Sequence, residues 1–351
     1  MTALLQINRT RLVELARGFQ DKTNVMAVVK NNAYNIGLEL AFDAFYEAGV
    51  RAFATASLID ALKLRALDPD VYIFLINPST DFQTIKEHRI AISLPSLSFY
   101  EQYRGELEGI EVHLVYKNLL RRFGFSSAED MMRVLDDPAV NVTGIWTHFA
   151  FATDFPDTDY EREKSNWLSL LAELEPYLEN LPFIHAQNSG SMMRDGAFPT
   201  PHTHIRVGAI LYGARPFFLN LPPAALPNVL TLSATVVETT NIKKGESAGY
   251  SAAFQAEADS KLAICDVGYG DGLLKARGKH DVMINGTRFP IAVLMMSHLI
   301  IQVDDSVKPG DTVYIYNDDL RIDHFTELGV GAVAEQMNAL NLQSLQVEIV
   351  E

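Results

Sequence analysis

The 351-residue sequence contains one cysteine, Cys265, so no disulfide can form within the chain. A chain without disulfides is typical of a reducing compartment. The longest apolar stretch, residues 289–303, is too short to span a bilayer and is interrupted by Ser297 and His298. The first residues show no cleavable signal pattern. We therefore expect a cytoplasmic protein that has no membrane partner.

Basic residues are also scarce, since 29 Lys and Arg face 44 Asp and Glu and leave a net charge of −15. A chain this acidic is unsuited to a phosphate backbone, so a nucleic-acid partner is not expected. The length exceeds that of one ordinary core and predicts two domains.

The first part of the chain alternates short apolar runs with amphipathic segments, which predicts a parallel sheet. Eight such units in about 215 residues favour an α/β fold with a closed (β/α)8 barrel over an open sheet. Helices are expected after residue 37, ending at Gly49, and over residues 127–135 and 160–178. Ser57 and Asp60 resemble the capping box of a further helix. The expected strands are residues 25–29, 52–56, 71–76, 90–94, 112–116, 143–147, 183–186 and 205–211.

The pattern changes after the proline-rich segment 220–228, which is typical of a linker. The dipeptide Asn285–Gly286 between two apolar runs is a strong hairpin signal. We therefore expect a barrel over residues 1–225 and a mainly β domain over 226–351. The strands expected in the second domain are residues 230–238, 261–266, 282–284, 287–294, 299–303 and 312–316.

Several polar residues fall at the carboxyl ends of the barrel strands, where barrels of this kind carry their active sites. Each alone has an ordinary interpretation, such as a surface lysine or a packing histidine. Together they would converge on one pocket. A lysine among cations suits imine chemistry, and a hydroxyl with free amides suits a phosphate, so the set suggests pyridoxal phosphate. These candidates are Lys30, Arg122, His148, Ser189, Arg206 and Gly208.

Motifs along most of the chain resemble those of the alanine racemase family, a pyridoxal-phosphate barrel followed by a β domain. The segment AVVKNNAYNIG is similar to that family's lysine motif, which is usually AVVKANAYGHG. Six other segments match in the same order and with compatible spacing, from about residue 25 to 340. These are RRFGF, THFA, HAQNS, IRVGAILYG, GESAGYSAAF and VGYGDGL.

The resemblance implies how a cofactor would be held. Lys30 would carry it as an imine, while Tyr34, Ser189 and the amides near Gly208 and Ala209 would bind its phosphate. His148 would pack against its ring. Arg206 would face the ring nitrogen, with His185 behind it as an orienting partner. A permanent cation there disfavours protonation of the ring and weakens it as an electron sink, which favours simple proton return.

The resemblance also implies two bases, Lys30 on one face of the α-carbon and Tyr250 on the other. Because the family takes this tyrosine from a partner subunit, it implies a homodimer with composite sites. Arg122 and the amide of Met296 would bind the substrate carboxylate, and Tyr269 would lie at the entrance. No metal is implied. The expected reaction is racemisation of a small amino acid, with L-alanine and D-alanine as the default pair.

Three positions depart from the family pattern. Val115 replaces a lysine that commonly holds the carboxylate-binding arginine, Ser297 replaces an acidic residue, and Leu342 aligns with a phosphate-binding tyrosine. These changes leave two alternatives open: a racemase for another amino acid such as serine, or a silent protein that only binds the cofactor. Whether the role is D-alanine biosynthesis or catabolism is not decided by the sequence.

Overall fold

The computed structural model describes residues 3–216 and 225–351, which form two compact units. One unit comprises residues 12–212, and the other contains residues 3–11 together with the segment from 225 to the end. Most of the expected linker 220–228 lies outside the described residues. No helix among the described residues combines the length and apolar character needed to cross a bilayer.

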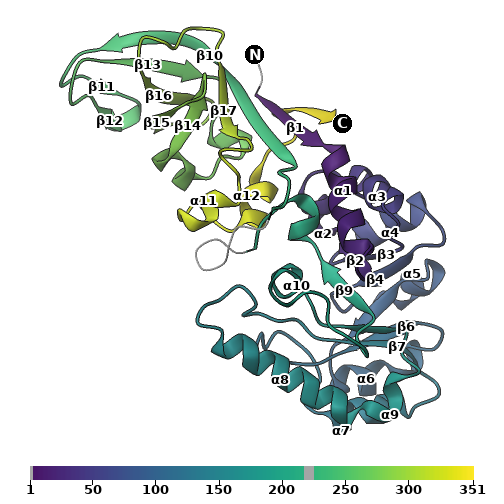
Figure 1. Ribbon diagram of the computed structural model, residues 1–351. Coiled ribbons are helices and arrows are strands. Elements are labelled where there is room, and N and C mark those ends of the chain that lie inside the picture. Colours follow the sequence, from purple (N-terminus) through teal and green to yellow (C-terminus); the bar gives the residue numbers. More distant parts are fainter. Residues whose placement is uncertain (1–2, 217–224) are drawn as a thin grey trace. The chain divides into compact units, whose positions relative to one another are not determined.

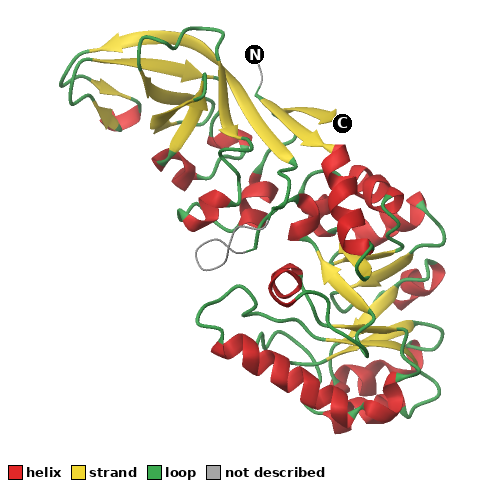
Figure 2. Ribbon diagram, viewed as in Figure 1, coloured by secondary structure: helices red, strands yellow, loops and turns green. Residues whose placement is uncertain are grey.

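The first unit is built on eight parallel strands, as expected, which Figure 2 shows in yellow among red helices. Their order is β8-β7-β6-β5-β4-β3-β2-β9. Hydrogen bonds from Thr203 N to Ile184 O and from Arg206 N to Gln187 O join the flanks of β9 and β8, so the sheet closes as a barrel. The strands are β2 (Asn24–Val28), β3 (Ala52–Thr55), β4 (Tyr72–Leu75), β5 (Ala91–Leu94), β6 (Glu111–Val115), β7 (Asn141–Trp146), β8 (Phe183–His185) and β9 (His204–Val207).

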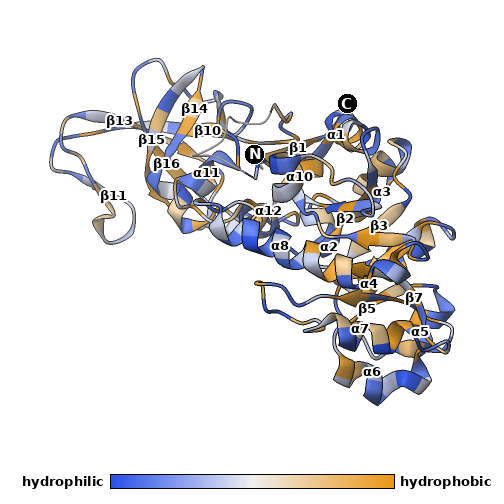
Figure 3. Ribbon diagram, turned by 60° about the horizontal axis from the view of Figure 1, so that its bottom comes forward, coloured by the Kyte–Doolittle hydropathy of each residue, from blue (hydrophilic) through white to orange (hydrophobic). Residues whose placement is uncertain are grey.

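The barrel strands are nearly all buried, which is why most of their residues are apolar (Figure 3). The last strand was expected over residues 205–211 but ends at Val207, and a 3-10 turn, η2 (Ala209–Tyr212), follows. The chain bends after Val207, where Gly208 lies directly against the side chain of Tyr34. Gly208 is therefore beyond the strand, at the rim of the barrel.

Helices connect the strands (Figure 1), and the expected helix ends are mostly confirmed. Gly49 follows the helix after residue 37 with φ 96°, and the Ser127 side chain caps α7 by accepting from Asp130 N. The helix expected at 160–178 is interrupted at Leu174. Ser57 makes no side-chain cap bond. The helices are α1 (Arg9–Gln20), α2 (Lys30–Tyr34), α3 (Leu38–Glu47), α4 (Leu58–Leu67), α5 (Phe82–Glu87), α6 (Leu97–Tyr103), η1 (Arg104–Glu106), α7 (Ala128–Leu135), α8 (Thr158–Glu173), α9 (Glu175–Leu178) and α10 (Ser189–Asp195).

The second unit is mainly antiparallel, with strand order β13-β16-β15-β14-β17-β10-β1-β18 and a further β13–β10 pairing. Asn285 and Gly286 both have positive φ, 49° and 79°, and turn β14 into β15 as their sequence predicted. The strands are β10 (Leu230–Ile242), β11 (Ser247–Ala248), β12 (Phe254–Gln255), β13 (Ser260–Cys265), β14 (Asp281–Ile284), β15 (Thr287–Leu294), β16 (Leu299–Val303) and β17 (Thr312–Tyr316). Short helices are η3 (Tyr250–Ala252), η4 (Tyr269–Asp271), η5 (Lys275–Lys279), α11 (His324–Glu327) and α12 (Val333–Ala339).

Both chain ends add to this second sheet. Strand β1 (Leu4–Asn8) pairs antiparallel with β10 and parallel with β18 (Gln346–Val350), and Figure 1 shows the two end strands side by side. The first residues, expected within the 1–225 barrel domain, thus contribute their strand to the β unit. The alternate residues Leu5 and Ile7 are buried, which provides the reason for this pairing.

The buried carboxylate of Asp323 binds two arginines, one of them close to the point where the polypeptide enters the second unit. Asp323 is 1% exposed and accepts hydrogen bonds from Arg215 N, Nε and Nη2, and also from Arg321. Burial by itself would raise the pKa of Asp323, but the hydrogen bonds from both arginines outweigh it and leave the pKa lowered. Asp323 therefore stabilises the unit as an anion.

We expect Asp323→Asn to lower the free energy of unfolding by about 3–5 kcal/mol, because it leaves two guanidinium groups uncompensated. Asp319→Asn, at an exposed position, is the matched control. Because the folded-state pKa of Asp323 is lowered, its stabilisation is present above the unfolded-state pKa and is lost as the pH falls. The difference in melting temperature between the two variants should therefore stay constant from pH 7 down to about 4 and shrink as the pH falls further towards about 2, and a difference that stays constant to the acid end would contradict this assignment.

Candidate active site

The lysine motif leaves β2 through a left-handed turn. Asn31, Asn32 and Ala33 have φ,ψ values near 55°, 50°, and the positive φ continues through Tyr34 and Asn35. Such a run costs about 1–2 kcal/mol per residue outside glycine and asparagine. Backbone bonds from Ala33 N to Val29 O and from Gly37 N to Asn32 O hold it in place. Its effect is to bring the Lys30 amine to 5.7 Å from the centre of the Tyr34 ring.

The Lys30 amine lies in a cationic and partly desolvated environment. Its pKa is lowered from the ordinary value first by burial and then by the charges of Arg122 and Arg206. A lowered pKa increases the fraction of neutral amine at neutral pH, which is the form that attacks an aldehyde. The structure thus brings together the three basic residues that the sequence placed at strand ends.

Ser189 lies at the centre of a cradle of hydrogen-bond donors. Its Oγ accepts from Gly208 N at 3.2 Å and from Ile210 N at 3.4 Å. Ser189 is not the helix cap that its position also allowed, because Asn188 caps α10 and forms a capping box with Ser191. The hydroxyl of Ser189 therefore remains available to a ligand.

Tyr34 completes this cradle from the carboxyl end of β2, the strand that pairs with β9. A Cβ atom at Gly208 would overlap with the Tyr34 hydroxyl and would lie 2.8 Å from its Cζ. Burial raises the pKa of Tyr34 to about 12, so the phenol stays protonated and can donate. Ile210 N points at Ser189 together with Gly208 N, which adds a third amide next to the Gly208 and Ala209 amides that the sequence named. Ala209 begins the turn that presents the Ile210 amide.

Arg206 is 4% exposed and lies on β9 inside the barrel. Its Nη1 donates to His185 Nδ1 at 2.7 Å, and its Nη2 donates to Thr147 O at 3.0 Å and to His148 Nδ1 at 3.2 Å. The guanidinium also lies 4.5 Å from the centre of the Trp146 ring. Burial and the charge of Arg122 lower its pKa to about 9, which still leaves it charged at neutral pH. The expected Arg206–His185 partnership is therefore present.

Both histidines are neutral acceptors. Burial, followed by the charge of Arg206, lowers the pKa of His148 to about 3 and that of His185 well below its usual range. Because an arginine only donates, each Nδ1 must be unprotonated. His148 follows β7 by two residues, so it lies just beyond the strand that was expected to end beside it.

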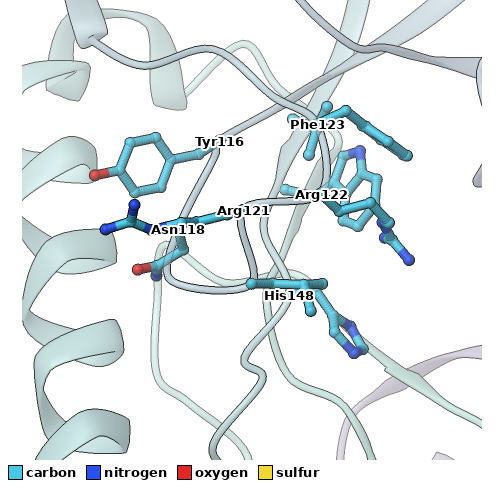
Figure 4. A pocket seen from close by; sticks show the side chains of 9 residues that line it. Tyr116, Asn118, Arg121, Arg122, Phe123 and His148 are labelled. Carbon is cyan, nitrogen blue, oxygen red and sulfur yellow. The ribbon is translucent and has the colours of Figure 1, made fainter.

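Arg122 lies in the loop after β6, which is closed by Phe125 N donating to Val115 O at 2.7 Å. Figure 4 shows Arg122 and His148 extending to one side of this loop, whereas Arg121 extends to the opposite side beside Tyr116. The guanidinium of Arg122 packs 4.8 Å from the centre of the Phe123 ring.

Glu163, on α8, supports the site and was not identified from the sequence. It is fully buried and accepts from Ala150 N at 2.9 Å and Phe151 N at 3.0 Å, just after His148. Asn118 extends the support, since its side chain donates to Glu163 O at 2.8 Å. A glutamate on an amphipathic helix carries no signal that distinguishes it from a surface residue.

The remaining expected residues belong to the second unit. Tyr269 and Met296 lie on adjoining segments, because Gly270 N donates to Met296 O at 2.8 Å. Tyr250 is 82% exposed, at the start of η3 between β11 and β12. Among the large hydrophobic side chains that the structure describes, Tyr250 has the highest exposed fraction.

Comparison with known proteins decides the family. The alanine racemase N-terminal domain model matches residues 4–216, and the alanine racemase C-terminal domain model matches residues 229–345. Alanine racemase 2 of Staphylococcus aureus (strain COL) is 42% identical over 358 residues, covering 100% of this chain and 99% of the relative. The chain belongs to the alanine racemase family.

Other members of the alanine racemase family are more distant. Alanine racemase of Methanococcus maripaludis is 28% identical, over 89% of this chain. Among solved structures, alanine racemase from Bartonella henselae with covalently bound pyridoxal phosphate has a TM-score of 0.85 and 25% identity, with full coverage of both chains. Alanine racemase from E. faecalis has a TM-score of 0.88 at 23% identity, which shows the shared fold.

The barrel side chains fit pyridoxal phosphate. Lys30, Arg122 and Arg206 form no ion pair with any carboxylate in the part of the chain that the structure describes. Three basic groups close enough to lower one another's pKa require anions for compensation. A phosphate in the Ser189 cradle and a substrate carboxylate at Arg122 would supply that charge.

We expect Gly208→Ala to weaken cofactor binding about 10- to 100-fold, because displacing Tyr34 removes one or two hydrogen bonds to a charged phosphate. Gly18→Ala is the matched control, since a Cβ there meets no atom within 4 Å. Fluorescence titration of the apoprotein with pyridoxal phosphate measures the dissociation constant. Equal constants for both variants would show that the phosphate binds elsewhere.

Proposed function

We propose that this protein is an alanine racemase, an isomerase that interconverts L-alanine and D-alanine with pyridoxal phosphate. The observation that carries the proposal is the Lys30 amine, whose pKa is lowered by burial and by the charges of Arg122 and Arg206, in the same barrel as the Ser189 cradle. The family membership and the 42% identity to a protein named alanine racemase support the same reaction. The chemistry needs only proton removal from the α-carbon and proton return.

The cofactor, when bound, supplies an aldehyde that takes up the amino group and a ring that withdraws electrons from the α-carbon. The residues of this chain do the rest. Lys30 would hold the aldehyde, Tyr34 and Ser189 with the Gly208 and Ile210 amides would hold the phosphate, and His148 would pack against the ring. A neutral His148 suits this position because it adds no second charge beside Arg206.

Arg206 would face the ring nitrogen and keep it unprotonated, since a charged guanidinium disfavours a second positive charge. In this way Arg206 would limit the withdrawal of electrons from the α-carbon and favour simple return of the proton. Arg122 would bind the substrate carboxylate, with the amide of Met296 as a second donor and Tyr269 at the entrance.

Lys30 and Tyr250 are the two proposed bases. Lys30 would exchange the proton on one face of the α-carbon and Tyr250 on the other. The exposure of Tyr250 supports a role outside its own unit, and we propose that it completes the site of a partner subunit. The protein would then be a homodimer with two composite sites in the cytoplasm.

Mixing two inactive variants tests this arrangement. Lys30→Ala and Tyr250→Phe should each lower the rate about 10²- to 10⁴-fold, the usual contribution of a general base. If the sites are composite, refolding equal amounts together restores about a quarter of the wild-type activity, because half of the dimers would have one of two sites intact.

The readout is deuterium exchange at the α-carbon of L- and D-alanine in heavy water, with L- and D-serine as comparison substrates. No recovery on mixing would place both bases in one chain and refute the composite site. Deuterium exchange with serine alone would show that serine, not alanine, is the substrate. The absence of exchange with every substrate would show that the protein only binds the cofactor.

A further inference from the structure

The interior of the barrel contains a chain of polar side chains that leads away from the proposed active site. His185 Nε2 lies 2.9 Å from His113 Nδ1, and His113 Nε2 lies 2.8 Å from Tyr72 Oη. Tyr72 is the first residue of β4, His113 is central in β6 and His185 ends β8. This series of hydrogen-bonded side chains begins at Arg206 and crosses the barrel towards the amino ends of the strands.

The direction of every proton in this chain follows from one fact. Arg206 donates to His185 Nδ1, so that nitrogen carries no proton and the neutral ring is protonated at Nε2. His185 Nε2 therefore donates to His113 Nδ1, and His113 in turn donates from Nε2 to the Tyr72 oxygen. The Tyr72 hydroxyl then donates its own proton to Thr143 Oγ1, 3.4 Å away, or to the neighbouring Glu111 carboxylate.

Both rings are neutral, as this arrangement requires. Burial, with the charges of His204 and Arg206, lowers the pKa of His113 to about 3. His113 is fully buried, and it stacks between Phe74, 4.5 Å away, and the Tyr72–Phe183 pair. A buried polar group of this kind is retained at a cost unless all its hydrogen bonds are made.

We propose that His113 and Tyr72 are positioning residues for Arg206. They fix the Nε2–H tautomer and the ring plane of His185, so that its Nδ1 lone pair points at Arg206 Nη1. The inference concerns these core residues alone and would stand if the substrate were an amino acid other than alanine. It assigns a function to two residues that contact neither the proposed substrate site nor the cofactor cradle.

Substitutions at His113 separate hydrogen bonding from packing. His113→Leu removes the acceptor, whereas His113→Asn retains an acceptor where Nδ1 lies. Tyr72→Phe keeps the ring, which stacks 4.1 Å from Phe183, and removes only the phenol. Phe183→Leu is the matched core control, because it disturbs the same packing and takes no part in the chain.

The measurement is ¹⁵N NMR of the histidine rings in the holoenzyme as purified. We expect a slowly exchanging His185 Nε2–H and an unprotonated Nδ1 in the wild type, the His113→Asn variant and the Phe183→Leu variant. In His113→Leu the His185 N–H signal should be lost and the Arg206 Nη protons should exchange faster. Tyr72→Phe should show the same loss at the His113 Nε2–H.

If His113 and Tyr72 served only to pack the core, the variants would show a different pattern of NMR signals. If Phe183→Leu and His113→Leu changed the His185 signals equally at equal loss of melting temperature, the chain would not position Arg206. An unchanged His185 tautomer and unchanged Arg206 exchange in His113→Leu would also overturn the proposal. Failure of His113→Asn to restore the signals, in a protein that remains folded, would do the same.

Discussion

The guanidinium of Arg206 is buried inside a barrel in which, among the described residues, no carboxylate pairs with it. A buried charge without a carboxylate partner must be stabilised by hydrogen bonds to neutral groups. Two neutral histidines, one backbone carbonyl and the face of Trp146 fulfil this requirement. The direction of the hydrogen bonds and the tautomers of both histidines follow from it, and the Arg206 charge adds to burial in lowering the pKa values of His148 and His185.

The positive charge of Arg206 also affects the pKa of the Lys30 amine. Arg206 and Arg122 both lower the pKa of Lys30, and the left-handed turn after β2 holds that amine close to the Tyr34 ring. The strain of the turn and the unpaired charges are local costs, of the kind that concentrate at functional sites. In the proposed function, a cofactor phosphate and a substrate carboxylate would offset them. This compensation of charge is a physical reason to place the proposed reaction in this pocket.

Much of this arrangement could be predicted from the sequence because its signals are local. The apolar runs of the sequence predicted the eight barrel strands that the structure contains. Lys30 comes just after β2, Arg122 lies in the loop after β6 and Arg206 lies on β9, so their places along the chain were also visible in the sequence. Other features depend on the folded chain. His113 is a single polar residue within a strand, and only the neighbouring strands show that it meets His185. The pairing of β1 and the donor role of the Ile210 amide likewise depend on residues far apart in the sequence.

The central claim is that a permanent cation, held by neutral histidines, faces the ring nitrogen of the cofactor. The most direct test is the ¹⁵N chemical shift of that nitrogen in the purified enzyme loaded with ¹⁵N-labelled pyridoxal phosphate. The account predicts the shift of an unprotonated pyridine, unchanged between pH 6 and 9. The shift of a pyridinium in that range would contradict it.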